Sequence, residues 1–449
     1  MASTISIRRG LDLKIAGRPA YKIVDAPRPA RTALQPGDFR YFRPRLLVRE
    51  GDAVKAGTPL LESKDDARVV LVSPASGTIE QIHRGERRKL LEIVVALAGE
   101  DAFEEFGALD DSDARALTRE ALVEKLLKGG AWSLIRRRPF ACIANPDERP
   151  QSVLICATPQ DAFDADPDLV LRGEEKDFQL GLDLAAKLTD GPVFLAVPEN
   201  AVSPALTAAT GVRTLRFSGP YPAGDPAVQI YHACPPKAKE SVWYLRAQDL
   251  LALARFVRTG RVSPERVVAL GGPAATERQL FRTRLGASAQ SLTEGRCEPG
   301  ELRLVSGSVM NGRKIPRTGF IGFYDTALFA LKEGREREFL SFFRPGLDKY
   351  TVSSTCLSSF LGKAEYALDT NLQGSLRNLV QSGIYEDVCP VGIWPDQTAK
   401  AVMAGDIEEM EKHGILDCAD CGLCTFVCPS KIEVGAILRR GIDLIRKEG

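Results

Sequence analysis

Four cysteines near the end of the chain have the spacing of an iron–sulfur motif. Cys418, Cys421, Cys424 and Cys428 form the pattern C-x2-C-x2-C-x3-C, and Pro429 follows directly. Bacterial ferredoxins use this pattern, in which three closely spaced thiolates bind one cluster and the cysteine before the proline binds the other cluster. A chain with one complete motif therefore needs a further ligand from elsewhere in the sequence.

A second cysteine–proline pair, Cys389-Pro390, lies upstream and can supply that ligand. We predict one [4Fe–4S] cluster with the following ligands: Cys389, Cys418, Cys421 and Cys424. Cys428 is the alternative fourth ligand. A structural zinc ion or an empty cysteine loop is the other interpretation, but zinc sites usually combine two C-x2-C units, or one such unit with histidines. His413 is the only histidine near the motif.

The composition indicates several folded domains and no bias towards a charged partner. The chain has 449 residues, which is too long for a single compact core. Hydrophobic residues make up 44% of it. A net charge of +1 gives no general attraction to nucleic acid or anionic lipid. We recognise no signal peptide, and no run approaches the roughly 18 apolar residues of a membrane span. Ten cysteines in such a chain favour reduced thiols and metal ligands over disulfides.

The first hundred residues predict an arm followed by a small β unit. Residues 1–45 are rich in Pro and Arg and predict an extended arm. Residues 46–102 alternate short β-type runs with glycine-containing turns, which is typical of an all-β unit.

This β unit resembles the biotinyl/lipoyl domain family. The resemblance lies in G-D-x-V-x-x-G at residues 51–57 and S-P-x-x-G at residues 73–77. Those domains carry a modified lysine eight residues before the proline of the second motif. Asp66 occupies that position here and Lys64 misses it, so we expect a docking module without a carrier function.

Residues 103–259 predict a mainly parallel sheet covered by helices, because apolar runs alternate with helical patterns. Strands are expected at 152–158 and 192–198, and helices at 178–189 and 247–260. Neither G-x-G-x-x-G nor G-x-x-x-x-G-K-[ST] occurs, so no flavin, NAD or phosphate-loop site is predicted. The basic triplet Arg136-Arg137-Arg138 is expected in a solvated loop.

The last two segments differ in their predicted structure. Residues 260–325 predict a small α+β unit with a helix at 276–286. Residues 326–449 predict a helical domain that contains the cysteine motif. Its expected helices are 326–343, 375–383, 396–414 and 433–448.

The chain as a whole resembles the A subunits of the sodium-translocating NADH:quinone reductases. The resemblance is carried by residues 7–19, 48–60, 181–189, 266–273, 303–312, 330–338 and 424–449. It implies a peripheral protein on the cytoplasmic face of the bacterial inner membrane, without a transmembrane segment of its own. Its partners would be subunits B to F of a complex that passes electrons from NADH to ubiquinone and exports Na⁺. No catalytic residue and no quinone-contacting residue follow from the resemblance.

The resemblance also implies an α/β multidomain fold. The expected domains are a biotinyl/lipoyl-like β domain (46–102), a Rossmann-like α/β domain similar to the flavoprotein subunit of respiratory complex I (103–259), an SLBB-like α+β domain (260–325) and a C-terminal helical domain (326–449).

The cysteines depart from that family. The family pattern leads us to expect only the equivalents of Cys424 and Cys428, whereas the related C subunit of the Rnf complex (ferredoxin:NAD oxidoreductase) has two complete motifs. This chain matches the second Rnf motif and the C-P of the first, which is the set that one cluster requires. The alternatives are therefore an Rnf-type subunit with its own flavin, or a non-redox scaffold whose loop holds zinc or nothing.

Overall fold

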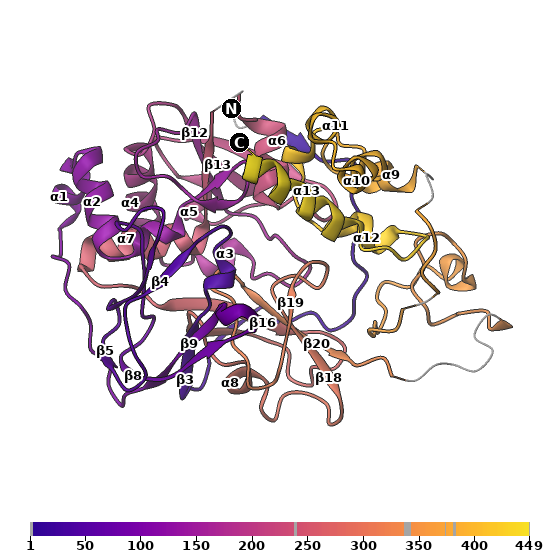
Figure 1. The fold of residues 1–449 in the computed structure, drawn as a ribbon, viewed down its shortest axis with the longest axis horizontal. Helices are drawn as coiled ribbons and strands as arrows, with labels where there is room; N and C mark the ends of the chain where they lie inside the picture. Colours follow the sequence, from indigo (N-terminus) through magenta and orange to yellow (C-terminus); the bar gives the residue numbers. More distant parts are fainter. Residues whose placement is uncertain (1–2, 238–239, 336–342, 373, 380–382, 449) are drawn as a thin grey trace.

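Three β-containing units and one helical unit make up the part of the chain that the structure describes (Figure 1). The structure is a computed structural model, and it describes residues 3–237, 240–335, 343–372, 374–379 and 383–448. Among these residues, we find no helix with the length and apolar character needed to span a membrane.

The predicted all-β unit is confirmed and consists of two small antiparallel sheets. One has the strand order β3-β9-β8-β5 and the other β4-β6-β7. The strands are β3 (Arg31–Leu34), β4 (Pro44–Leu46), β5 (Ala53–Val54), β6 (Pro59–Ser63), β7 (Val70–Val72), β8 (Gly77–Arg84) and β9 (Leu90–Leu97). Alternate apolar side chains face a common core, which includes Leu60, Leu71, Ile79 and Ile93.

The central unit is a seven-stranded sheet in the order β1-β14-β13-β12-β15-β10-β11. The first five strands in this order run parallel, and β10 and β11 are antiparallel additions at one edge. The strands are β1 (Ser3–Ser6), β10 (Arg136–Arg138), β11 (Cys142–Ile143), β12 (Ser152–Cys156), β13 (Val193–Pro198), β14 (Arg213–Ser218) and β15 (Val242–Arg246). The strands expected at 152–158 and 192–198 are thus confirmed as β12 and β13.

Helices cover both faces of this sheet. Its helices are α1 (Asp111–Ala116), α2 (Arg119–Lys128), α3 (Pro167–Val170), α4 (Glu175–Ala186), α5 (Pro204–Thr207), α6 (Pro226–Ala233) and α7 (Ala247–Thr259). The helices expected at 178–189 and 247–260 are confirmed as α4 and α7, which pack against each other on one face. α7 ends where Gly260 adopts φ +65° and donates its N–H to the carbonyl oxygen of Phe256.

The α+β unit is built on a six-stranded sheet in the order β19-β18-β20-β16-β17-β2. The elements are β2 (Ile23–Asp25), β16 (Glu265–Gly271), β17 (Gln279–Arg284), α8 (Ala289–Thr293), β18 (Leu302–Ser306), β19 (Arg313–Ile315) and β20 (Ala327–Lys332). The helix predicted at 276–286 is wrong, because this segment forms β17. The start of the helix predicted at 326–343 is wrong too, because residues 327–332 form β20, so the sheet extends past the expected boundary at 325. Short apolar runs do not distinguish a strand from a helix by periodicity.

Residues 1–45 do not form a free arm. Strand β1 joins the central sheet, β2 joins the six-stranded sheet and β3 joins the β unit. Pairing with strands of three different units gives this segment its structure. A local sequence pattern does not encode such pairing. The first 45 residues therefore connect all three β-containing units.

The C-terminal unit packs on the face of the central sheet that lies opposite α4 and α7. Its elements are a 3₁₀ turn at Leu357–Phe360, α9 (Ile384–Val388), α10 (Pro395–Ala404), α11 (Ile407–Lys412), a 3₁₀ turn at Ile415–Asp417, α12 (Leu423–Val427) and α13 (Val434–Glu448). The apolar side chains of these helices and of that sheet face form one continuous core. In Figure 1 these helices are orange and yellow and lie on the side of the central unit away from α4 and α7.

The predicted helices of this unit have different outcomes. The helix expected at 433–448 is confirmed as α13. The helix expected at 396–414 is divided, because Gly405 ends α10 with φ +74° and Asp406 caps α11. No helix is present in the described part of 375–383, and positions 380–382 lie outside the described residues.

Candidate metal centre

The four predicted ligands come together in the C-terminal unit. Cys389, Cys418, Cys421 and Cys424 line one pocket, between the end of α9 and the start of α12. Cys389 and Cys418 are buried, whereas Cys421 and Cys424 are half-buried. The segment between Cys389 and Cys418 folds as α10 and α11, which bring the upstream cysteine–proline pair back to the motif.

Local backbone geometry explains why each cysteine faces the pocket. Cys389 directly follows α9, and its N–H donates to the carbonyl oxygen of Tyr385 at 3.0 Å. The loop between Cys418 and Cys424 turns tightly, with φ +56° at Asp420 and φ +79° at Gly422. A Cβ on Gly422 would lie 2.7 Å from the carbonyl oxygen of Met310, so this glycine is required by both its backbone angle and its close contact.

Cys428 is not part of this pocket. Its sulfur lies 3.2 Å from the hydroxyl oxygen of Tyr385 and accepts the N–H of Ile432 at 3.4 Å. The Tyr385 and Cys428 side chains are almost completely buried. The geometry therefore favours Cys389 over Cys428 as the companion of the three closely spaced cysteines.

Burial in the pocket disfavours the thiolate form of the four cysteines. Burial raises the pKa of Cys389 to about 11 and that of Cys418 to about 12. Burial also raises the pKa of Cys421 and of Cys424, and repulsion from the other thiols of the group adds to this effect. Four thiolates in this pocket therefore require a bound cation, and this donor set fits an iron–sulfur cluster.

A zinc site and an iron–sulfur cluster place different demands on the positions of their ligands. Within the described ranges, no three His, Cys, Asp or Glu side chains are positioned to hold a single metal ion. A tetrahedral zinc site requires all its ligands about 2.0–2.3 Å from one point. A cluster instead binds each cysteine to a different iron, so its ligands surround a larger volume.

Two neighbouring units hold the cysteine loop from outside. From the central sheet, Arg138 donates to the carbonyl oxygens of Leu416 (2.7 Å) and Cys418 (3.0 Å), and the Tyr221 hydroxyl donates to that of Cys421 (2.7 Å). From the six-stranded unit, Asn311 donates through its side-chain amide to the carbonyl oxygen of Asp420. The loop is therefore fixed where three units meet.

The expectation that the arginine triplet lies in a solvated loop is wrong. Arg136, Arg137 and Arg138 form β10, which pairs with β15. The Arg136 guanidinium lies over the rings of Tyr244 and Tyr324, 4.7 and 4.0 Å from their centres. No motif in the sequence distinguishes such a strand from a basic loop, because its role depends on which side chains pack around it.

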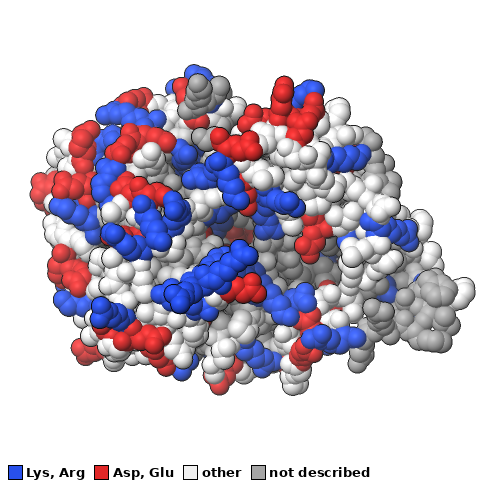
Figure 2. Space-filling view, in the orientation of Figure 1, with Lys and Arg blue, Asp and Glu red and all other residues white. Residues whose placement is uncertain are grey.

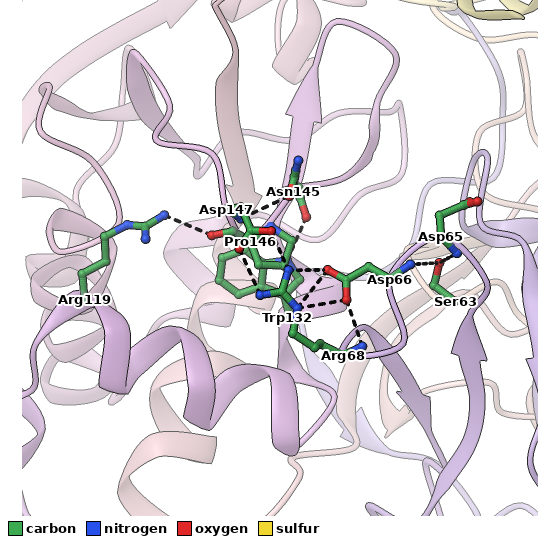
Figure 3. A network of polar contacts seen from close by, with 10 residues as sticks. Ser63, Asp65, Asp66, Arg68, Arg119, Trp132, Asn145, Pro146 and Asp147 are labelled. Carbon is green, nitrogen blue, oxygen red and sulfur yellow. Dashed lines mark hydrogen bonds and ion pairs between the residues drawn. The ribbon is translucent and has the colours of Figure 1, made fainter.

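In biotinyl/lipoyl domains one hairpin carries the modified lysine. The equivalent hairpin of this β unit is fixed to the central unit. Arg68 bridges Asp66, in the position of that lysine, and Asp147 of the central unit (Figure 3). Both carboxylates accept hydrogen bonds through both of their oxygens from the guanidinium group. Lys64 is exposed, but its backbone N–H donates to the carbonyl oxygen of Arg43. This hairpin is therefore a contact between two units of the chain.

Four family models match consecutive parts of the chain. They are described as the NqrA N-terminal barrel-sandwich hybrid domain (residues 5–98), the NqrA second alpha/beta domain (117–262), the NQRA C-terminal domain (267–317) and a 4Fe-4S dicluster domain (381–433). The last of these contains all four predicted ligands.

Curated relatives match over the whole length of the chain. The A subunits of the Na(+)-translocating NADH-quinone reductases from Saccharophagus degradans and Pseudomonas aeruginosa are 38% identical, each over 99% of this chain and all of the relative. The protein of the same name from Yersinia pestis is 36% identical over the same shares. Among solved structures, a NAD+-reducing [NiFe]-hydrogenase aligns with 12% identity over 78% of this chain and 68% of its own, with a TM-score of 0.37, which is too low to carry an argument.

Proposed function

This chain belongs to the family of the Na(+)-translocating NADH-quinone reductase A subunits, and we propose that it serves as an iron–sulfur member of that family. Its function is electron transfer from NADH to quinone coupled to Na⁺ export, as part of the complex. The proposed ligands of one [4Fe–4S] cluster are Cys389, Cys418, Cys421 and Cys424. The cluster would place this protein on the electron path of the complex.

The single observation that carries the cluster proposal is the placement of Cys389 and the four cysteines of the motif. Four line one pocket, whereas Cys428 faces Tyr385. For a single cluster, the motif predicts that its first three cysteines and the cysteine of the other C-P pair are the ligands, and that its own fourth cysteine is not.

The residues of the chain bind the cluster and shield it from water. When bound, such a cluster supplies one-electron transfer. Leu423 and Leu438 line the pocket and are almost completely buried, so they exclude water from the buried side. Cys421 and Cys424 are only half-buried, and they mark the side from which a redox partner approaches most closely.

The alternatives have less support. Full-length identity to the NADH-quinone reductase A subunits favours this family over an Rnf-type protein. The match of residues 381–433 to a 4Fe-4S dicluster domain favours iron–sulfur ligands over a scaffold held by zinc.

Strand order supports the Rossmann-like interpretation of the central unit. Taken in chain order from β12 to β15, the four central strands have the spatial order 3-2-1-4, which is the order in the first part of a Rossmann sheet. We propose residues 46–102, 103–259, 260–325 and 326–449 as the main folding units, the third of them SLBB-like, with β20 completing it from beyond the boundary. Residues 1–45 contribute a strand to each of the first three units.

We propose that the chain binds subunits B to F on the cytoplasmic side of the inner membrane and that quinone is the electron acceptor of the complex. The C-terminal unit supports a docking role, because large apolar side chains are exposed there, among them Leu357, Phe360, Leu372, Leu376 and Trp394. Figure 2 shows, in contrast, lysines and arginines interspersed with acidic residues over the left side of the same view.

Metal analysis of the full-length chain tests this proposal. After anaerobic purification, we expect about four irons and four acid-labile sulfides per chain, and an EPR signal on reduction. Cys421→Ser is expected to lose most of this iron and the signal. Zinc in place of iron, or neither metal after anaerobic reconstitution, would contradict the proposal.

A further inference from the structure

Arg138 places a buried cation beside the cysteine loop. Its side chain is 7% exposed, and its Nη2 donates to the carbonyl oxygens of Leu416 and Cys418 at 2.7 and 3.0 Å. It belongs to the central sheet, where it pairs with Val242 of β15, so a rigid element positions it. The next residue back along the strand, Arg137, instead forms an ion pair with Glu148 at 2.5 Å.

The hydrogen bond to the carbonyl oxygen of Cys418 places the charge of Arg138 directly beside the backbone of a proposed ligand. A charge in this buried position is screened little by solvent.

A buried cation beside a cluster has a defined effect on its chemistry. A cluster bound by four thiolates becomes more negative when it accepts an electron, and a fixed positive charge nearby stabilises the reduced form. Net charge and hydrogen bonding are among the factors that set the reduction potentials of these clusters.

We infer that Arg138 is a positioning residue that fixes the Cys418 turn and raises the reduction potential of the cluster. This inference rests on the proposed function, since it requires the cluster to be present. It assigns the central sheet a direct influence on the redox centre of the C-terminal unit.

A redox titration of the full-length chain, followed by EPR, tests this inference. Arg138→Gln removes the charge but keeps a hydrogen-bond donor. At a fixed potential, we expect its ratio of reduced to oxidised cluster to be at least tenfold lower than in the wild type, which is about 59 mV for a one-electron couple. Arg138→Lys keeps the charge and is expected to remain within about threefold of the wild type, or about 30 mV.

Arg137→Gln is the matched control, because it removes from the same strand a guanidinium that contacts Glu148 and not the cysteine loop. We expect its ratio of reduced to oxidised cluster to change less than in Arg138→Gln. An Arg138→Gln variant with full iron content and a wild-type ratio would overturn the inference, as would an equal shift in Arg137→Gln.

Two outcomes separate this inference from the proposed function. If the wild type contains no iron, the proposed cluster fails and Arg138 has no such role. If the wild type contains the cluster and Arg138→Gln does not take up iron, the redox titration of Arg138→Lys tests the inference instead. A loaded lysine variant that is tenfold less reduced than the wild type contradicts the inference, and one within threefold supports it.

Discussion

The hydroxyl oxygen of Tyr385 lies 3.2 Å from the sulfur of Cys428 in the interior of the C-terminal unit. Tyr385 stands four residues before Cys389, where the pattern C-x2-C-x2-C-x3-C would have its third cysteine. In a two-cluster ferredoxin, the cysteine at the position of Cys428 binds the cluster of that other motif. The tyrosine therefore packs against the thiol that a second cluster would need. Because a tyrosine stands at this cysteine position of the first motif, the chain has a complete set of ligands for one cluster only.

We predict that Cys389→Ser and Cys428→Ser have opposite effects on iron content. Cys389→Ser removes a side chain of the pocket and is expected to lose most of the iron. Cys428→Ser leaves all four pocket cysteines in place and is expected to retain about four irons per chain. Iron and sulfide analysis of both variants, purified in parallel, measures this. Loss of iron in Cys428→Ser with retention in Cys389→Ser would reverse our ligand assignment.

We predict that Tyr385→Phe lowers stability without changing iron content. The substitution keeps the buried ring but removes the hydroxyl that Cys428 contacts, so we expect a loss of about 1 kcal/mol in the free energy of unfolding. Denaturant unfolding under anaerobic conditions gives the stability. The Tyr385 ring lines the pocket, and a large loss of iron in this variant would indicate that its hydroxyl group supports the pocket as well.

We predict that Gly422→Ala is more harmful than Gly405→Ala. Both glycines have similar positive φ angles, +79° and +74°, so alanine costs about 1–2 kcal/mol of backbone strain at either position. Only at Gly422 would the new Cβ also approach a backbone carbonyl, that of Met310, whereas Gly405 has open space around it.

We therefore expect Gly422→Ala to lower both stability and iron content, and Gly405→Ala to lower stability alone. Chemical denaturation and iron analysis of the two variants provide the comparison. Equal iron content in both would show that the loop tolerates the displacement.

We predict that Asp38 makes stability fall as the pH rises towards 6. Burial raises the pKa of this carboxyl to about 6 in the folded protein, although Arg313 and the N–H of Phe323 act in the opposite direction. Because the pKa is about 3.9 in the unfolded chain, the folded state binds the proton more tightly. The stabilisation is complete below a pH of about 3.9 and is lost as the pH rises through about 6.

Asp38→Asn removes this titration. Relative to the variant, the wild type is expected to lose about 1 kcal/mol of unfolding free energy between about pH 5 and 6, and little more above about pH 7. Urea unfolding at several pH values measures the difference between the two proteins. A difference that is independent of pH would show that Asp38 keeps its ordinary pKa.

The sequence by itself determined the types and spacing of the proposed ligands and the alternation of strands and helices in the central unit. Three cysteines at intervals of three residues specify a local turn, and repeated apolar periodicity specifies elements such as β12, α4 and α7. These features depend on neighbours along the chain, which is why a local pattern predicts them.

Only the tertiary structure decided which cysteine completes the pocket and which residues surround it. Cys389 and Cys428 are equivalent in the sequence, as each precedes a proline, and the packing of Tyr385 against Cys428 separates them. Likewise, residues 279–284 and 327–332 became strands through pairing with β16, and Arg138 reached the cysteine loop from a sheet 280 residues away in the sequence. Contacts between distant segments set these outcomes, and no local pattern encodes them.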